Sequence, residues 1–106
     1  MDIVGHELAH GVTQYASGLI YQGESGALNE SFSDIFGVSI EAWKFPNSYN
    51  YEIGENVGFT LRSMENPKLY GDPDTYEGDN WASINGGDNG GVHTNSGVQN
   101  FWYYLL

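Results

Sequence analysis

The stretch His6-Glu7-Leu8-Ala9-His10 lies close to the start of the chain and is the strongest functional signal in the sequence. In a helix, residues four apart lie on one face about one turn from each other, so two imidazoles at this spacing can bind one Zn²⁺ from the same side. Glu7 is offset by one position and can reach a water molecule on the metal without being a ligand. A chance match and a solvated helix face are the simpler alternatives. The surrounding segment is largely apolar, and the pattern therefore favours zinc.

Apolar residues recur at helical spacing in two segments of the first half of the chain. The first predicts a helix over Asp2–Ala16, with Gly18 as its stop signal. Its apolar set is Ile3, Val4, Leu8, Val12 and Tyr15. The second predicts a helix over Gly26–Trp43, which Pro46 ends. Its apolar set is Leu28, Phe32, Ile35, Phe36, Ile40 and Trp43.

The second predicted helix also carries an acidic stripe. The stripe positions share one face and are Glu30, Asp34, Gly37 and Glu41. If the apolar face packs against the first helix, the stripe is solvated and needs no further explanation. Glu30, however, lies between Leu28 and Phe32, which favours partial burial, and a buried carboxylate is costly unless it is paired or binds a metal. A catalytic zinc site needs three protein ligands and an open position, so Glu30 is a candidate third ligand.

The second half of the chain predicts a long irregular region followed by one more helix. Residues 47–91 are rich in Gly, Asp, Asn and Pro, which predicts loops with short helical turns such as one over Phe59–Met64. A structureless stretch of this length is unusual, and a functional loop that binds metal is the usual exception. A third helix is expected to open at Asn95 or Ser96, both good N-caps. The predicted fold class is mainly α, with about three helices and a long metal-binding loop region.

Composition and charge exclude several classes of function. The 106 residues carry 3 basic and 14 acidic side chains and a formal charge of −11, which argues against binding to nucleic acid or an anionic membrane surface. Apolar content of 40% is too high for a disordered acidic tail. The absence of Cys excludes disulfides and thiolate chemistry. The N-terminal stretch is not expected to be a signal peptide, and the sequence has no run of 18 apolar residues for a membrane span.

Three motifs, in this order along the chain, resemble the thermolysin family of zinc metalloendopeptidases. They are the stretch over residues 6–10, Gly23-Glu24-Ser25-Gly26-Ala27-Leu28-Asn29-Glu30-Ser31-Phe32-Ser33-Asp34, and Asp88-Asn89-Gly90-Gly91-Val92-His93-Thr94-Asn95-Ser96-Gly97. Glu30 follows His10 by 20 residues, which is the family's spacing for the third ligand. The resemblance covers nearly the whole chain and implies a partial thermolysin-like catalytic domain over residues 1–106, truncated at both ends.

The resemblance also implies roles for individual residues of the zinc site. It makes His6, His10 and Glu30 the zinc ligands and Glu7 the catalytic carboxylate. The partners that orient the two histidines are Asn29 and Asp34. Ligand imidazoles usually donate their other N–H to such a group. The donors to the transition-state oxyanion are Tyr21 and His93, with Asp88 holding His93. Without the resemblance, the sequence favours an ordinary half-buried aromatic at Tyr21. It does not distinguish a catalytic His93 from an ordinary histidine in a Gly-rich loop.

Two further groups of residues follow from the same resemblance. A calcium site is implied at Asp2, Glu41, Glu52 and Glu55, because Ca²⁺ prefers hard oxygen ligands. Asn50 stands where better-known members carry an Asp, so one calcium is expected rather than an adjacent pair. The alternative is a set of solvated acidic residues in a very acidic chain. The lining of the substrate pocket is implied to be Ile53, Val57, Leu61 and Arg62, which as plain sequence could equally belong to a core.

The resulting hypothesis is a zinc-dependent metalloendopeptidase that hydrolyses peptide bonds with a water molecule on the metal and prefers a bulky apolar residue after the scissile bond. Its implied cofactors are Zn²⁺ and Ca²⁺, its implied partners are protein or peptide substrates, and its implied location is extracellular. A non-catalytic zinc- or calcium-binding fragment of such an enzyme is the alternative. An acidic binding module without metal would require all three motifs to be accidental.

Overall fold

Three helices dominate the fold, as the sequence predicts. The computed structural model describes residues 1–106. The helices are α1 (Asp2–Ala16), α2 (Gly23–Lys44) and α3 (Gly87–Leu105). The shorter elements between α2 and α3 are β1 (Glu52–Ile53), η1 (Glu55–Val57), β2 (Arg62–Ser63) and η2 (Pro67–Tyr70). The mainly α prediction is confirmed, and no helix is both long and apolar enough to cross a membrane.

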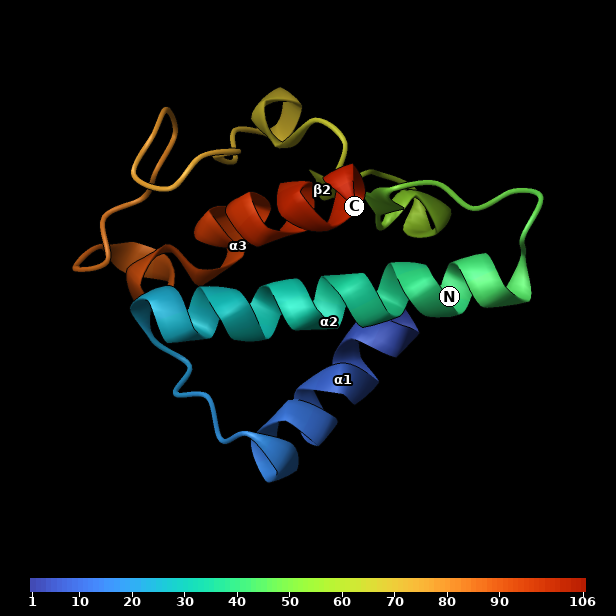
Figure 1. The fold of residues 1–106 in the computed structure, drawn as a ribbon, viewed down its shortest axis with the longest axis horizontal. Coiled ribbons are helices and arrows are strands. Elements are labelled where there is room, and N and C mark those ends of the chain that lie inside the picture. The colour runs from blue at the N-terminus through green and yellow to red at the C-terminus, as the bar shows by residue number, and fades with distance from the viewer.

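Helix α2 lies between the other two helices, with α1 crossing one side of it and α3 running along the other (Figure 1). Two glycines allow α1 and α2 to approach closely at their crossing. A Cβ on Gly5 would lie 3.0 Å from the Gly37 Cα, and a Cβ on Gly37 would collide with the Asp2 carbonyl. This contact between backbones brings the side chains that flank the crossing, on both helices, within reach of one another.

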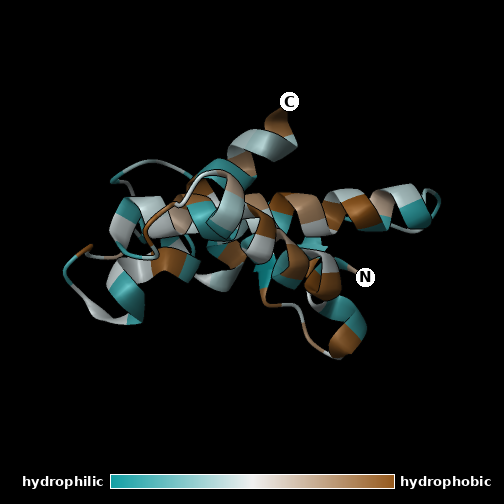
Figure 2. Cartoon of the chain, turned by 90° about the horizontal axis from the view of Figure 1, so that it is seen from below, coloured by the Kyte–Doolittle hydropathy of each residue, from teal (hydrophilic) through white to brown (hydrophobic).

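The face of α2 that packs against α1 is the acidic one. Glu30, Asp34 and Glu41 are all buried, so the alternative of a solvated stripe is wrong. The apolar side chains of both helices instead remain largely exposed. On α2 these are Leu28, Phe32, Phe36 and Trp43, and on α1 they are Val4, Leu8, Val12 and Tyr15. Figure 2 shows hydrophobic segments alternating with hydrophilic ones along the helices. Glycines and acidic residues therefore form much of the interface between α1 and α2, although Ile40 also lies against Gly5.

The interior is unusually polar. Only 6 hydrophobic residues are buried, whereas 14 polar or charged residues are. A small apolar core of Val38, Ile53 and Met64 joins α2 to the β1–β2 pair. Because buried polar groups are costly unless they are hydrogen-bonded or bind a ligand, this composition points to a functional site inside the fold.

The middle region contains a two-stranded hairpin where a short helix was expected. β1 and β2 are antiparallel, with Ile53 opposite Arg62. The prediction of a helical turn over Phe59–Met64 is therefore wrong. Gly54 and Gly58 adopt positive φ angles of 93° and 112°, which let the chain reverse between the strands. The rest of residues 47–86 is irregular apart from η1 and η2, as predicted, whereas residues 87–91 belong to α3.

Helix α3 begins at Gly87, earlier than the predicted start at Asn95 or Ser96, and its first turn is left-handed. Residues 88–91 have φ angles between 50° and 83°, and a regular right-handed helix follows them. Asp88 Oδ2 accepts a hydrogen bond from the His93 N–H (2.9 Å), so Asp88 satisfies a free backbone donor of the first regular turn. The Asn95 side chain does not cap a helix but holds the backbone of Ala82, at 2.9 Å to both N and O.

Candidate metal centre

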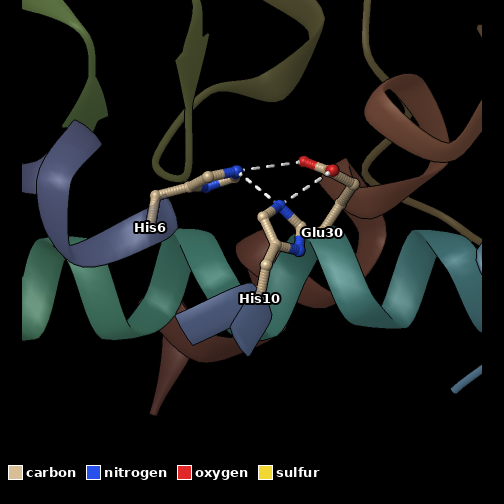
Figure 3. Close-up of side chains that lie close together, drawn as sticks. All are labelled: His6, His10 and Glu30. Carbon is tan, nitrogen blue, oxygen red and sulfur yellow. Dashed lines mark hydrogen bonds and ion pairs between the residues drawn. The ribbon is translucent and has the colours of Figure 1, made fainter. Parts of the chain in front are cut away.

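Two histidines from α1 and one glutamate from α2 converge on a single point (Figure 3). The Nε2 atoms of His6 and His10 lie 3.0 Å apart. His6 Nε2 lies 3.4 Å from Glu30 Oε2, and His10 Nε2 lies 3.3 Å from Glu30 Oε1. The sequence separation of four residues in α1 places both rings on the face that the Gly5–Gly37 crossing turns toward α2.

The far side of each imidazole is held by α2. His6 Nδ1 donates to Asp34 Oδ1 at 2.8 Å, and His10 Nδ1 donates to Asn29 Oδ1 at 2.8 Å. A histidine that donates from Nδ1 carries its free lone pair on Nε2. Both histidines therefore present Nε2 lone pairs to the same point, which is the orientation that a metal ion requires.

Asp34 is a fully buried carboxylate that is kept ionised by its neighbours. Burial raises its pKa, but the hydrogen bond from His6 and the charge and hydrogen bonds of Arg62 outweigh this and lower the pKa to about 2. Arg62 Nε and Nη2 donate to the two Asp34 oxygens at 2.8 and 2.7 Å. An ionised Asp34 can only accept from His6, which fixes the tautomer of that imidazole.

The donor set fits a zinc ion. Glu30 is 1% exposed, and its Oε2 has no hydrogen-bond partner, which is expensive for a buried carboxylate. Burial raises the Glu30 pKa, yet hydrogen bonds from His93 and Tyr21 outweigh it and the pKa is lowered, so the side chain is an anionic ligand. Two imidazole nitrogens and one carboxylate are a ligand set that zinc accepts while keeping an open position.

Tyr21 and His93 lie beside the same carboxylate, although they come from opposite ends of the sequence. The Tyr21 hydroxyl donates to Glu30 Oε1, and His93 Nε2 lies 3.3 Å from both that oxygen and the Tyr21 hydroxyl. His93 Nδ1 is held by Asp88 Oδ1 at 2.6 Å. The hydrogen bond to Glu30, opposed by burial and aided by Asp88, raises the His93 pKa to about 9. Burial and then Glu30 raise the pKa of Tyr21, so both groups are hydrogen-bond donors at neutral pH.

Glu7 lies beside the first histidine on α1, and its side chain is exposed. It is not part of the group formed by His6, His10 and Glu30. That Glu7 borders the metal centre and reaches a water molecule on the ion stays a prediction.

A second acidic group forms at the opposite end of the α1–α2 crossing. Carboxylate oxygens of Asp2, Glu41 and Glu55 lie within 4.8 Å of one another. One oxygen each of Glu41 and Glu55 is buried without a partner. Burial and then the neighbouring carboxylates raise the pKa of Glu55, although a backbone hydrogen bond partly opposes them. The structure does not bring Glu52 into this group: its carboxylate accepts a hydrogen bond from Thr60 at 2.9 Å.

The four residues expected to line a substrate pocket have different environments. Val57 and Leu61 are exposed, at 62% and 42%. Ile53 is fully buried in the apolar core, because it pairs across the hairpin and faces Val38 and Met64. Arg62 directs its guanidinium to Asp34. Of these four residues, only Val57 and Leu61 therefore offer apolar side chains at the surface.

Sequence reasoning missed several polar residues around the site. Asn100 and Ser31 are both buried: the Ser31 hydroxyl donates to Asn100 Oδ1, and Asn100 Nδ2 donates to Asp34. Asp72 is also buried, and burial, partly offset by Arg62, raises its pKa to about 7. The one available signal was a polar Asn100 directly before the aromatic run of the last helix, and periodicity alone does not distinguish it from a solvated residue.

Comparison with known families gives a match over most of the chain. The family described as thermolysin metallopeptidase, alpha-helical domain, matches residues 17–106. Helix α1, with His6, Glu7 and His10, precedes that match, but relatives align over the whole chain. The bacillolysin of Bacillus cereus is 52% identical over 112 residues, and the thermostable neutral protease NprT of Geobacillus stearothermophilus is 51% identical.

These relatives are much longer than this chain. The alignments cover 100% of this chain but 19% and 20% of the two relatives, so the chain spans about a fifth of their length. A similar solved structure is the precursor of protealysin, a metalloproteinase from Serratia proteamaculans. It superimposes with a TM-score of 0.74 and 39% identity over 98% of this chain and 37% of the protealysin chain.

Proposed function

Because the chain belongs to the thermolysin metallopeptidase family, we propose that it carries the metal-binding and catalytic residues of a zinc-dependent metalloendopeptidase. The observation that carries the proposal is the convergence of His6, His10 and Glu30, with both imidazoles held from behind by α2. The first two of the three motifs that resemble the family supply those same residues.

The proposed chemistry is hydrolysis of a peptide bond. Bound zinc would polarise the scissile carbonyl and lower the pKa of the attacking water. Glu7, exposed beside His6, takes the proton of that water and delivers it to the leaving amine. His6, His10 and Glu30 hold the ion, while Asp34 and Asn29 keep the two imidazoles in their ligating tautomers.

Tyr21 and His93 are the proposed donors to the developing oxyanion. Both are hydrogen-bond donors, both lie beside Glu30, and both are partly exposed, so a substrate can reach them. Asp88 holds the His93 ring with its Nε2 directed toward the centre. Donors placed in advance of the reaction stabilise the charge that develops in the transition state without reorganising.

The substrate preference and location are further parts of this proposal. Val57 and Leu61 present exposed apolar side chains that suit a bulky apolar residue after the scissile bond. The substrates are proteins or peptides, and the proposed location is extracellular, which rests on the family alone.

The proposal is tested in a graft in which this chain replaces the matching segment of the Geobacillus protease, called here the NprT graft. We expect it to cleave a peptide with leucine after the scissile bond, to lose activity with 1,10-phenanthroline, and to regain it with zinc. The unaltered protease is the control. A graft that binds zinc but cleaves nothing would favour the alternative of a non-catalytic metal-binding segment.

We also propose that Asp2, Glu41 and Glu55 bind one Ca²⁺. The three carboxylates lie within 4.8 Å, and two of their oxygens are buried without a partner, which a cation would relieve. Asp2 Oδ2 also accepts from the Gly54 N–H at 2.6 Å, so the site connects α1 to the β1–η1 turn. Glu52 is the fourth residue implied by the family, and it lies on the adjacent strand.

Calcium is therefore expected to stabilise the 106-residue chain against heat. A ligand present at 100 times its dissociation constant stabilises the folded state by about 2.7 kcal/mol, and in a domain of this size that corresponds to a rise in Tm of roughly 10 °C or more. Thermal unfolding followed by circular dichroism, with calcium and then with EGTA, measures it. Glu41→Gln should remove most of the shift, whereas Glu77→Gln, an exposed control, should keep it. Equal Tm values with calcium and with EGTA would contradict the proposal.

A further inference from the structure

Asn100 of α3 joins the metal centre through a chain of buried hydrogen bonds. Its Nδ2 donates to Asp34 Oδ2 at 2.8 Å, and its Oδ1 accepts from Ser31 Oγ at 2.7 Å. We propose that Asn100 is a positioning residue for the zinc site, which it serves by fixing the Asp34 carboxylate that orients His6. This inference rests on the proposed function, because it concerns the same ligands.

Each end of the Asn100 amide meets only one kind of partner. Ser31 and Asp34 lie three residues apart on one face of α2, and the Asn100 side chain reaches both from α3, which runs alongside (Figure 1). Asp34 as a carboxylate accepts and cannot donate, so it requires the NH₂ end of the amide. The carbonyl end then receives the Ser31 hydroxyl. Ser31 and Asn100 are 0% and 1% exposed, so solvent offers no substitute partner.

Asp34 has a complete set of donors only when Asn100 is present. Oδ1 accepts from His6 Nδ1 and Arg62 Nη2, and Oδ2 accepts from Arg62 Nε and Asn100 Nδ2. Two donors on each oxygen, from α1, α3 and β2, prevent the carboxylate from rotating about its bond to α2. Without Asn100, Oδ2 keeps only the Arg62 donor and Asp34 is free to turn toward Arg62. That rotation would change the direction in which Asp34 holds the His6 ring.

A purely structural role for Asn100, in which it only attaches α3 to α2, makes a different prediction. Asn95 provides the comparison within the same helix. It is also buried, and it also makes two hydrogen bonds at 2.9 Å, but both go to the Ala82 backbone and neither touches the network around Asp34. Losing either asparagine should destabilise the fold, but only losing Asn100 should change the metal site.

The test compares Asn100→Ala with Asn95→Ala in the full 106-residue chain. Zinc affinity is measured by competition with a chromophoric chelator, and ligand geometry by the absorption spectrum of bound Co²⁺. We expect Asn100→Ala to weaken zinc binding about 10-fold, the lower end of the range for residues that support metal ligands. Its Co²⁺ bands should shift as well. Asn95→Ala should lower the thermal midpoint yet keep zinc affinity within about twofold and the Co²⁺ spectrum unchanged.

Ser31→Ala provides a second variant, which removes the hydroxyl that holds the Asn100 carbonyl and so loosens the amide that donates to Asp34, while deleting only one oxygen atom. It should weaken zinc binding in the same direction, and it decides the question if Asn100→Ala fails to fold. Zinc affinity within twofold of the parent in the folded Asn100→Ala chain, or in Ser31→Ala when that chain does not fold, would overturn the inference. A parent chain that binds no zinc would instead overturn the proposed function, and this inference with it.

Discussion

Replacing Glu7 with glutamine in the NprT graft is expected to lower kcat for peptide cleavage by at least about 100-fold while the zinc content stays at the parent level. Glutamine has the shape of glutamate but cannot accept a proton from the attacking water. Glu7 is exposed beside His6 and lies outside the ligand group, so its replacement should leave the metal in place. Steady-state kinetics on the leucine-containing peptide, together with zinc analysis of the same sample, measure both halves of the expectation.

The matched control for this variant is Glu77→Gln, which makes the same chemical change at an exposed loop position. It should leave kcat unchanged. If Glu7→Gln retained more than about a tenth of the parent turnover, Glu7 would not be the proton acceptor. If it lost zinc as well as activity, Glu7 would have to be reassigned to holding the metal.

Replacing His10 with alanine is expected to remove stoichiometric zinc. His10 Nε2 lies 3.0 Å from His6 Nε2 and 3.3 Å from Glu30 Oε1, so its loss leaves two ligands at a site that needs three. Loss of a supporting group typically weakens metal binding 10- to 100-fold, so loss of a ligand should weaken it by more than about 100-fold. Atomic absorption after dialysis of the 106-residue chain, and of the graft, provides the measurement.

Gln14→Ala is the control for His10→Ala, because Gln14 is exposed one turn further along α1. It should retain one zinc per chain. Full zinc occupancy in His10→Ala would show that the ligand assignment is wrong, since no other histidine of α1 could replace it.

The helices could be predicted from the sequence to different degrees. The bounds of α1 are those predicted, because a strong apolar period and a terminal Gly18 delimit it. α2 begins three residues earlier than predicted, at Gly23, which takes a φ of 54° and has no cap motif before it. The start of α3 was misplaced because residues 88–91 form a left-handed turn, a geometry that N-cap rules do not describe. The β1–β2 hairpin was missed because its strands are only two residues long.

The sequence by itself determined that His6 and His10 share one face of a helix, since a four-residue spacing is a local fact, whereas the prediction of Glu30 as the third ligand rests on the resemblance to the family. It also determined the helical class and the resemblance to the family. Only the tertiary structure decided which face of α2 is buried. Periodicity states which residues share a face, but not which face a neighbouring helix covers, and here the glycine contact of Gly5 with Gly37 turned the acidic face inward.

Local patterns do not show which distant segments pack together, and this is why sequence analysis identified some residues of the site and missed others. Asn100 and Ser31 belong to segments 69 residues apart, and no local pattern relates them. Membership of the acidic group was likewise decided in three dimensions, where Glu55 joins Asp2 and Glu41 while Glu52 turns to Thr60. Hydrogen bonds and ion pairs act over about 3 Å, and only the packing of α1, α2 and α3 brings distant segments to that range.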